Sequence, residues 1–224
     1  MHHGRRVVTR AGRAGRRRLA RPLVLGLTGS IGMGKSTAAK ALRRLGIPVF
    51  SSDETVHRLL AAGGRGVAPV AAAFPGARDG AAISRPRLAA EVFGNPTALA
   101  RLEGILHPLV WAETDRFVAA ARRRRRPLVV LDVPLLYETK GETRAHAVAV
   151  VTAPPFVQRT RVLGRSGQTP ARLAAILARQ MPDRDKRRRA DFLVPTGGSK
   201  RESLRRLARI VMLLKRGPSK RKRR

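Results

Sequence analysis

Residues 29–36 read Gly29-Ser30-Ile31-Gly32-Met33-Gly34-Lys35-Ser36, and this stretch fits the phosphate-binding pattern G-x-x-x-x-G-K-[ST]. An apolar run at residues 23–27 precedes it, and an Ala- and Leu-rich stretch with helical spacing, residues 37–45, follows it. The pattern binds phosphate where a strand turns through glycines into a helix, because backbone N–H groups and the positive helix N-terminus then face the anion. Lys35 can reach the β- and γ-phosphates, and the Ser36 hydroxyl can bind Mg²⁺. The sequence therefore predicts a nucleoside triphosphate site.

Five short apolar runs predict strands that are buried on both faces of a parallel sheet: residues 23–27, 48–50, 127–131, 147–152 and 192–194. Stretches with helical spacing separate these runs, which is typical of a parallel sheet flanked by helices. The length of 224 residues fits one such α/β domain with an inserted lobe. The expected fold class is therefore α/β with a five-stranded parallel sheet.

Two stretches between the runs are longer than a crossover needs. The first has helical spacing at Leu99, Leu102, Ile105 and Leu106, and predicts a helical lobe at about residues 58–120 whose Gly- and Pro-bearing part, residues 63–86, is a loop region. The second, residues 156–189, is dense in arginine and contains a predicted helix at residues 170–178 that starts with Pro170 after Thr169 as N-cap. Residues 122–126 are all arginine and fit the solvated end of a helix before a strand.

The composition limits the class of protein. No cysteine is present, which excludes disulfide bonds, thiolate metal sites and cysteine catalysis in this chain and suits a cytoplasmic protein. No run of eighteen apolar residues occurs, so we expect no membrane-spanning helix.

The net charge of +34 is shared between the ends of the chain and its body, which still carries +19. Residues 1–22 contain eight arginines and residues 215–224 contain seven lysines or arginines, with no acidic residue in either. One interpretation is nucleic-acid binding through phosphate contacts; the other is a set of solvated charges on a protein with polyanionic substrates. With one Trp, one Tyr and six Phe there is little from which to build a base-stacking surface, which favours the second. We expect residues 1–22 and 213–224 to be disordered extensions, and nucleic acid to be bound, if at all, through them.

Two carboxylates follow predicted strands. Asp132 comes directly after residues 127–131, where ligands bind in open α/β sheets, so it could hold Mg²⁺ or instead cap the turn before Pro134. Asp53 follows the second run. Spacing alone favours Ser52 or Asp53 as the N-cap of the next helix, although a base that accepts the proton of an attacking hydroxyl also fits this position.

Three further side chains have both a structural and a functional interpretation. Arg161 and Arg165 are spaced i, i+4 and so are expected on one helix face, either closing over the γ-phosphoryl group as part of a lid or simply solvated. His107 precedes Pro108 beside an expected helix break, where most lone histidines are structural.

Taken in order, the motifs resemble the dephospho-CoA kinase family. The matches are residues 26–37, Asp53 after residues 47–49, Leu106-His107-Pro108, Asp132-Val133-Pro134-Leu135-Leu136 with Glu138, Gln158 with Arg161 and Arg165, Ala178-Arg179-Gln180, and Ala190-Asp191. They span about residues 23–212. The phosphate-binding loop alone occurs in many small-molecule kinases, whereas its ordered combination with the later motifs is far more specific.

The resemblance implies a P-loop kinase, similar to nucleoside monophosphate kinases, that uses ATP and Mg²⁺ to phosphorylate the ribose 3′-hydroxyl of dephospho-CoA. It implies that residues 58–120 hold the acceptor and that residues 156–189 form the lid. It also implies that Asp53 is the base and that Lys35 and Arg161 neutralise the transferred phosphoryl group. ATP would be bound by residues 29–37, the last of which is Thr37, and by Arg165. The acceptor would be bound by Asp53, His107 and Glu138, and the metal by Ser36 and Asp132.

Two positions depart from the family pattern. Ser51 stands where many members have an acidic residue, and Thr196 stands where many have Asn. Two other functions also fit the sequence: a P-loop kinase acting on a nucleotide or nucleoside, and a basic nucleic-acid-binding ATPase.

Overall fold

The computed structural model describes residues 21–216, so most of the two basic extensions expected from the sequence lies outside the described residues. One boundary differs from expectation. Helix α9 (Lys200–Lys215) continues past residue 212, because Ile210, Val211 and Leu214 on its inner face pack against the sheet.

Within residues 21–216, one sheet contains five parallel strands, as the five apolar runs predict. They are β1 (Leu23–Thr28), β2 (Val49–Ser51), β5 (Leu128–Asp132), β6 (Ala147–Thr152) and β7 (Phe192–Pro195), in the spatial order β2-β5-β1-β6-β7. Asp132 pairs in register with Ser51 of β2 on one side and with Leu27 of β1 on the other. The carboxyl ends of these three strands therefore meet at one edge, where the chain after each strand carries the candidate site residues.

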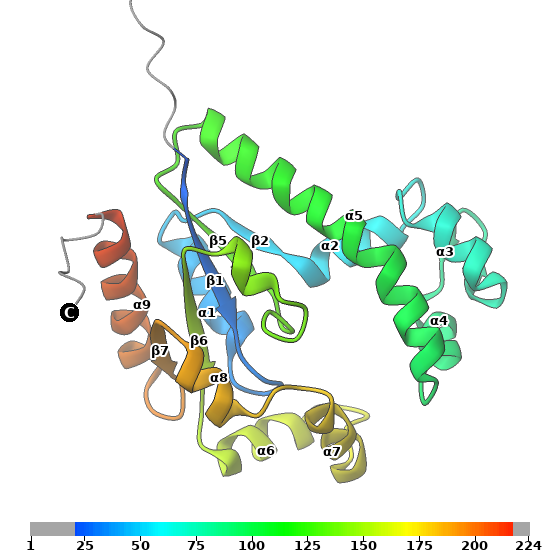
Figure 1. The fold of residues 1–224 in the computed structure, drawn as a ribbon. Coiled ribbons are helices and arrows are strands. Elements are labelled where there is room, and N and C mark those ends of the chain that lie inside the picture. The colour runs from blue at the N-terminus through cyan, green and yellow to red at the C-terminus, as the bar shows by residue number, and fades with distance from the viewer. Residues whose placement is uncertain (1–20, 217–224) are drawn as a thin grey trace, which may run out of the picture.

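Helices cover both faces of the sheet (Figure 1). Helix α1 (Lys35–Arg44) and α9 bury Leu42 and Leu207 against Leu25 and Leu27 on one face. On the other face, α2 (Ser52–Leu60) and the second half of α5 (Pro96–Arg123) cover residues that include Val129 and Leu131. Alternate residues of each central strand thus enter different cores, which explains why these strands read as continuous apolar runs.

The stretch between β2 and β5 has its own hydrophobic core. Helix α3 (Val67–Ala73), the 3₁₀ turn η1 (Pro75–Ala77), the antiparallel hairpin of β3 (Arg78–Asp79) and β4 (Ala82–Ile83), and α4 (Arg85–Val92) pack against the start of α5. Their shared core contains Val70, Phe74, Leu88, Leu102 and Leu106. The expectation that residues 63–86 form a loop region is wrong, because they contain α3 and the hairpin. Only Val70 of α3 is fully buried, so the helix leaves little hydrophobic pattern to read.

Helix α5 runs without interruption through Pro108, so the expected helix break beside His107 is absent. A proline inside a helix removes one hydrogen bond and costs about 3 kcal/mol. Leu106 and Val110 on either side are buried in the lobe core and the sheet core respectively. Burial of such side chains contributes about 1.5–3 kcal/mol each, which offsets the lost bond.

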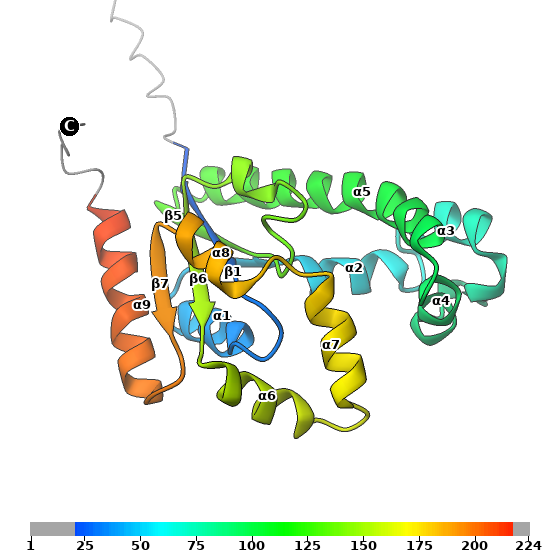
Figure 2. The same ribbon diagram turned by 60° about the horizontal axis from the view of Figure 1, so that its bottom comes forward.

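The arginine-dense segment forms three short helices, α6 (Pro155–Leu163), α7 (Pro170–Ala178) and α8 (Asp183–Arg189). Helix α7 has the predicted bounds, and Thr169 is its N-cap, since the Thr169 hydroxyl accepts a hydrogen bond from the Arg172 N–H at 3.2 Å. Figures 1 and 2 place α6 and α7 beyond the carboxyl ends of the strands, with α7 on the side of the inserted lobe. The segment therefore lies next to the phosphate-binding loop.

Candidate functional site

The phosphate-binding loop connects β1 to α1 as predicted. Gly34 is the N-cap of α1 and has a left-handed φ of 88°, and Gly32 has a φ of 77°. Gly32 is also required by packing, because a Cβ there would lie 2.6 Å from Cγ2 of Val162 in α6. Gly34 has no side chain with which to cap the helix, and its carbonyl accepts hydrogen bonds from the Thr37 and Ala38 N–H groups at 3.1 Å. The N–H groups of Lys35 and Ser36, which come before these, lie where a helix N-terminus binds an anion.

Lys35 and Asp132 form an ion pair at the carboxyl edge of the sheet, with 2.6 Å between Lys35 Nζ and Asp132 Oδ1. Their side chains are only 13% and 8% exposed. Burial raises the pKa of Asp132, the nearby charge of Asp53 raises it further, and the Lys35 ammonium opposes both. The carboxylate of Asp132 is thus held by Lys35 at the end of β5.

Asp53 lies in the first turn of α2 with an exposed side chain. The N-cap is Ser51, whose hydroxyl oxygen accepts a hydrogen bond from the Glu54 N–H at 3.2 Å, so the expectation that Ser52 or Asp53 caps this helix is wrong. The Ser52 hydroxyl instead donates to the backbone carbonyl of Asp132 at 3.3 Å. Asp53 is therefore free of the capping role and lies within electrostatic range of Asp132.

Arg161 reaches the phosphate-binding loop through Thr196. Its guanidinium donates to the Thr196 carbonyl at 2.6 Å and to the Thr196 hydroxyl at 3.1 Å. That hydroxyl donates in turn to the Met33 carbonyl at 2.7 Å. Thr196, at the position where the sequence departs from the family pattern, thus holds Arg161 beside the loop.

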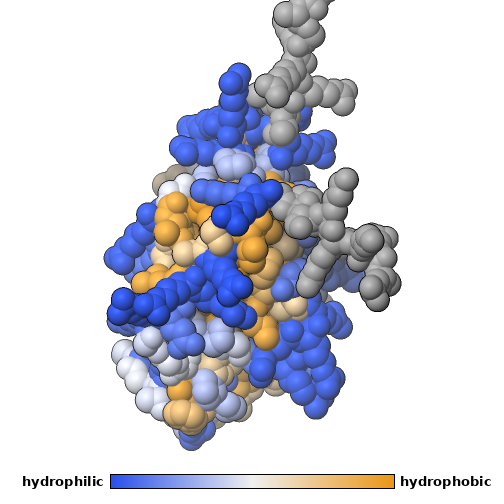
Figure 3. Space-filling model, turned by 90° about the vertical axis from the view of Figure 1, so that its left-hand side faces the viewer, coloured by the Kyte–Doolittle hydropathy of each residue, from blue (hydrophilic) through white to orange (hydrophobic). Residues whose placement is uncertain are grey.

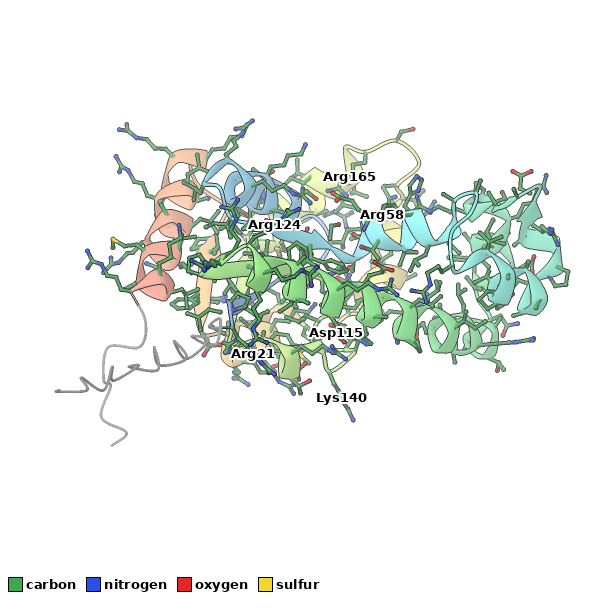
Figure 4. The ribbon with its side chains drawn as sticks, turned by 90° about the horizontal axis from the view of Figure 1, so that it is seen from above. Arg21, Arg58, Asp115, Arg124, Lys140 and Arg165 are labelled. Carbon is green, nitrogen blue, oxygen red and sulfur yellow. The ribbon has the colours of Figure 1, made fainter. Side chains whose placement is uncertain are left out.

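Arg165 does not share a helix face with Arg161. Helix α6 ends at Leu163, and Arg165 lies on the exposed connection to α7 (Figure 4). The i, i+4 expectation is wrong because Gly164 is the C-cap, and the chain leaves the helix before Arg165.

A cavity of about 660 Å³ lies between α5, the loop after β5 and the end of α7. His107 lines it from α5, Glu138 and Lys140 from the loop, and Arg179 and Gln180 from the segment after α7. The structure therefore brings together His107 and Glu138, which are separated by thirty residues in the sequence. Asp53 is not among the residues that line this cavity.

Lys186 of α8 pairs with the cavity residue Glu138, a pairing that the sequence motifs do not reveal. It is fully buried, lies 2.9 Å from Glu138 Oε1, and donates to the Pro134 carbonyl at 3.4 Å. Glu138 Oε1 also accepts a hydrogen bond from the Met181 N–H at 2.8 Å. Glu138 thus links the arginine-dense segment to the loop after β5. Lys186 stands among exposed arginines in the sequence, so only its burial in the structure identifies it as the partner of Glu138.

We expect Glu138→Gln to lower the free energy of unfolding by about 3 kcal/mol, because it leaves the buried Lys186 ammonium without a counter-charge. Urea denaturation measures this change. Asp115→Asn is the matched control, since Asp115 on the surface of α5 pairs with Arg144 but is 67% exposed (Figure 4), and should change stability by no more than ~1 kcal/mol. A double variant, Glu138→Gln with Lys186→Met, should recover part of the loss. Equal losses of stability in Glu138→Gln and Asp115→Asn would contradict the role of Glu138 as the buried counter-charge of Lys186.

The outer face of α9 is basic and lies away from the loop. Figure 3 views this face and shows hydrophilic side chains crossing partly hydrophobic surface. Arg201, Arg205, Arg206 and Arg209 are exposed there, together with Leu204 and Leu213. Part of the positive charge of the described residues thus lies on one exposed helix face.

Few acidic or histidine side chains are available to bind a metal. Within the described residues no group of three or more His, Asp or Glu residues could hold a metal ion. Mg²⁺ bound with a nucleotide needs only one or two protein oxygens, the rest coming from phosphate and water. The exposed Ser36 hydroxyl and the Asp132 carboxylate are oxygen ligands of that kind.

Between residues 21 and 216, no helix has the length and apolar character to cross a bilayer.

Comparisons with known proteins point to one family. A sequence model of a family described as dephospho-CoA kinase matches residues 23–202. A protein named dephospho-CoA kinase from Paramagnetospirillum magneticum is 62% identical over 165 residues, which cover 73% of this chain and 77% of the relative. The crystal structure of TT1252 from Thermus thermophilus is similar with a TM-score of 0.76 at 35% identity, over 86% of this chain and 97% of that one. A dephospho-CoA kinase from Campylobacter jejuni shares the fold, with a TM-score of 0.61 at 22% identity over 88% of this chain and 100% of that one.

Proposed function

The chain belongs to the dephospho-CoA kinase family, whose reaction is the ATP-dependent phosphorylation of dephospho-CoA, and on this premise we propose that it phosphorylates the ribose 3′-hydroxyl with the residues described above. It is a kinase of coenzyme A biosynthesis, and the products of the proposed reaction are coenzyme A and ADP. The observation that supports this assignment of residues most directly is the buried Lys35–Asp132 pair at a sheet edge, with Asp53 within electrostatic range.

At the ATP end, the loop at residues 29–37 holds the phosphates through those backbone N–H groups that are not engaged within the protein, as that of Ile31 is, and Lys35 leaves Asp132 for the β- and γ-phosphates. Arg161, held beside Met33 by Thr196, neutralises charge that develops on the transferred group. Arg165 contributes to ATP binding from the exposed connection after α6. Positioning and electrostatic stabilisation account for most of the catalysis in phosphoryl transfer.

At the acceptor end, dephospho-CoA lies between the lobe at about residues 58–120 and the lid at about residues 156–189. His107, Glu138 and the cationic Lys140 and Arg179 of the cavity suit an acceptor that carries both a nucleoside and a diphosphate. Asp53 orients the ribose 3′-hydroxyl and accepts its proton as the oxygen attacks the γ-phosphorus.

Mg²⁺ fits the oxygen ligands at the start of α1. Ser36 and Asp132 would hold it, and the ion would neutralise charge on the β- and γ-phosphates. We place the reaction in the cytoplasm, which accords with the lack of cysteine.

The test is to incubate the purified full chain with Mg-ATP and dephospho-CoA and to detect coenzyme A by mass spectrometry. We expect one phosphate to be added per acceptor, at the 3′ position. Parallel reactions contain a nucleoside, a nucleoside monophosphate, or RNA in place of dephospho-CoA. Phosphorylation of a nucleoside or nucleotide without coenzyme A formation would reassign the acceptor, and hydrolysis stimulated by RNA alone would indicate a nucleic-acid-dependent ATPase.

A further inference from the structure

Two glutamines hold the phosphate-binding loop from outside. Gln158 Nε2 donates to the Ile31 carbonyl at 2.7 Å, and Gln180 Oε1 accepts from the Ile31 N–H at 3.1 Å. Together these bonds fix the peptide groups on both sides of Ile31. Because the loop binds phosphates through its backbone N–H groups, the orientation of these peptides determines the shape of the phosphate site.

Gln158 belongs to a wall packed directly against the loop. Its side chain comes from α6 and the residue is 8% exposed. A Cβ on Gly32 would lie 3.0 Å from the Gln158 carbonyl O, in addition to its clash with Val162. This contact is therefore tight and is confined to the ATP end of the site.

Gln180 is placed differently. It lies past the end of α7, is half-buried, and lines the cavity that also contains His107 and Glu138. One side chain thus binds the loop backbone and borders the acceptor cavity. An amide side chain has both a carbonyl acceptor and an NH₂ donor, so its oxygen can hold Ile31 while its nitrogen meets a ligand in the cavity.

We propose that Gln180 is a positioning residue that couples the acceptor cavity to the ATP-binding loop. Dephospho-CoA in the cavity holds the Gln180 amide against the Ile31 N–H and so orders the loop for the triphosphate. This inference rests on the proposed function. Thermodynamic linkage requires ATP to raise the affinity for the acceptor by the same factor. A coupling carried by one hydrogen bond corresponds to a factor of about two to ten.

The test measures binding of a non-hydrolysable ATP analogue with Mg²⁺ by isothermal titration calorimetry, with and without saturating dephospho-CoA. Wild type, Gln180→Met and Gln158→Met are compared, because methionine keeps the side-chain length and removes the polar groups. We expect dephospho-CoA to tighten analogue binding about two- to tenfold in wild type and to have no such effect in Q180M. Q158M should bind the analogue more weakly under both conditions and keep the wild-type ratio.

Three outcomes would overturn the proposal: no enhancement in wild type, wild-type enhancement in Q180M, or loss of enhancement in both variants. Should Q180M not fold by circular dichroism, Gln180→Ala provides the same test at this half-buried position. Coenzyme A formation by the wild-type preparation tests the proposed function separately. A preparation that makes coenzyme A and keeps its enhancement in Q180M refutes the coupling while leaving the kinase assignment intact.

Discussion

Lys35→Ala is expected to lower kcat by at least about a hundredfold, because Lys35 carries the positive charge that is proposed to stabilise the transferred phosphoryl group. The same change removes the counter-charge of the buried Asp132 carboxylate, so the free energy of unfolding should also fall by about 3 kcal/mol at pH 7. Steady-state kinetics and urea denaturation measure the two effects. Lys40→Ala, at an exposed position on the same helix, is the control and should leave both near wild type.

The stability loss in Lys35→Ala should depend on pH with a definite sign. Burial already raises the pKa of Asp132 in the wild-type protein, and removing Lys35 raises it further. A carboxyl whose pKa is higher in the folded state binds its proton more tightly there, so the folded state gains stability below that pKa and loses it as the pH rises through it. The difference from wild type should therefore shrink as the pH is lowered from 7 towards 4. A defect that stayed constant over this range would contradict the burial of an unpaired carboxylate.

Asp53→Asn is expected to lower kcat by about two to four orders of magnitude, as loss of a general base does, while the Kd for ATP stays within about twofold of wild type. Folding should be unaffected because Ser51, not Asp53, caps α2. Single-turnover kinetics and calorimetric titration with ATP measure the two constants.

The control for this variant is Glu54→Gln, next to Asp53 on α2, which breaks only the exposed ion pair with Arg43. We expect its kcat to remain near wild type. Near-normal turnover in Asp53→Asn would show that another group positions the 3′-hydroxyl, and an equal loss in Glu54→Gln would indicate a general electrostatic effect of α2.

The sequence predicted the parts of the fold whose cause is local or periodic. Continuous apolar runs mark strands buried on both faces, so all five strands of the sheet lie within one residue of their predicted bounds. The glycine loop and the Thr169-Pro170 start of α7 depend on backbone conformations that only a few residue types favour. Such features can be recognised without knowing what packs against them.

The features that were predicted wrongly depend on distant contacts. Pro108 stays within a helix because two separate cores bury its neighbours, and α3 forms although Val70 is its only buried residue. In the site, Lys186 is distinguished from the adjacent arginines only by its burial against Glu138. The cap at Ser51 was missed because Ser52 and Asp53 are equally good capping residues, and only the end of β2 decides among them.

The uninterrupted α5 also limits how related chains can vary in length. One residue inserted near Pro108 would rotate the lobe by about 100° about the helix axis relative to the sheet, and would turn His107 away from Glu138. Insertion of a full helical turn would keep the orientation of the lobe relative to the sheet but move the lobe by about 5.4 Å along the helix axis. We therefore expect length changes to be tolerated in the Asp79–Ala82 hairpin turn, at exposed Gly80, and not along α5, which connects the inserted lobe to the sheet.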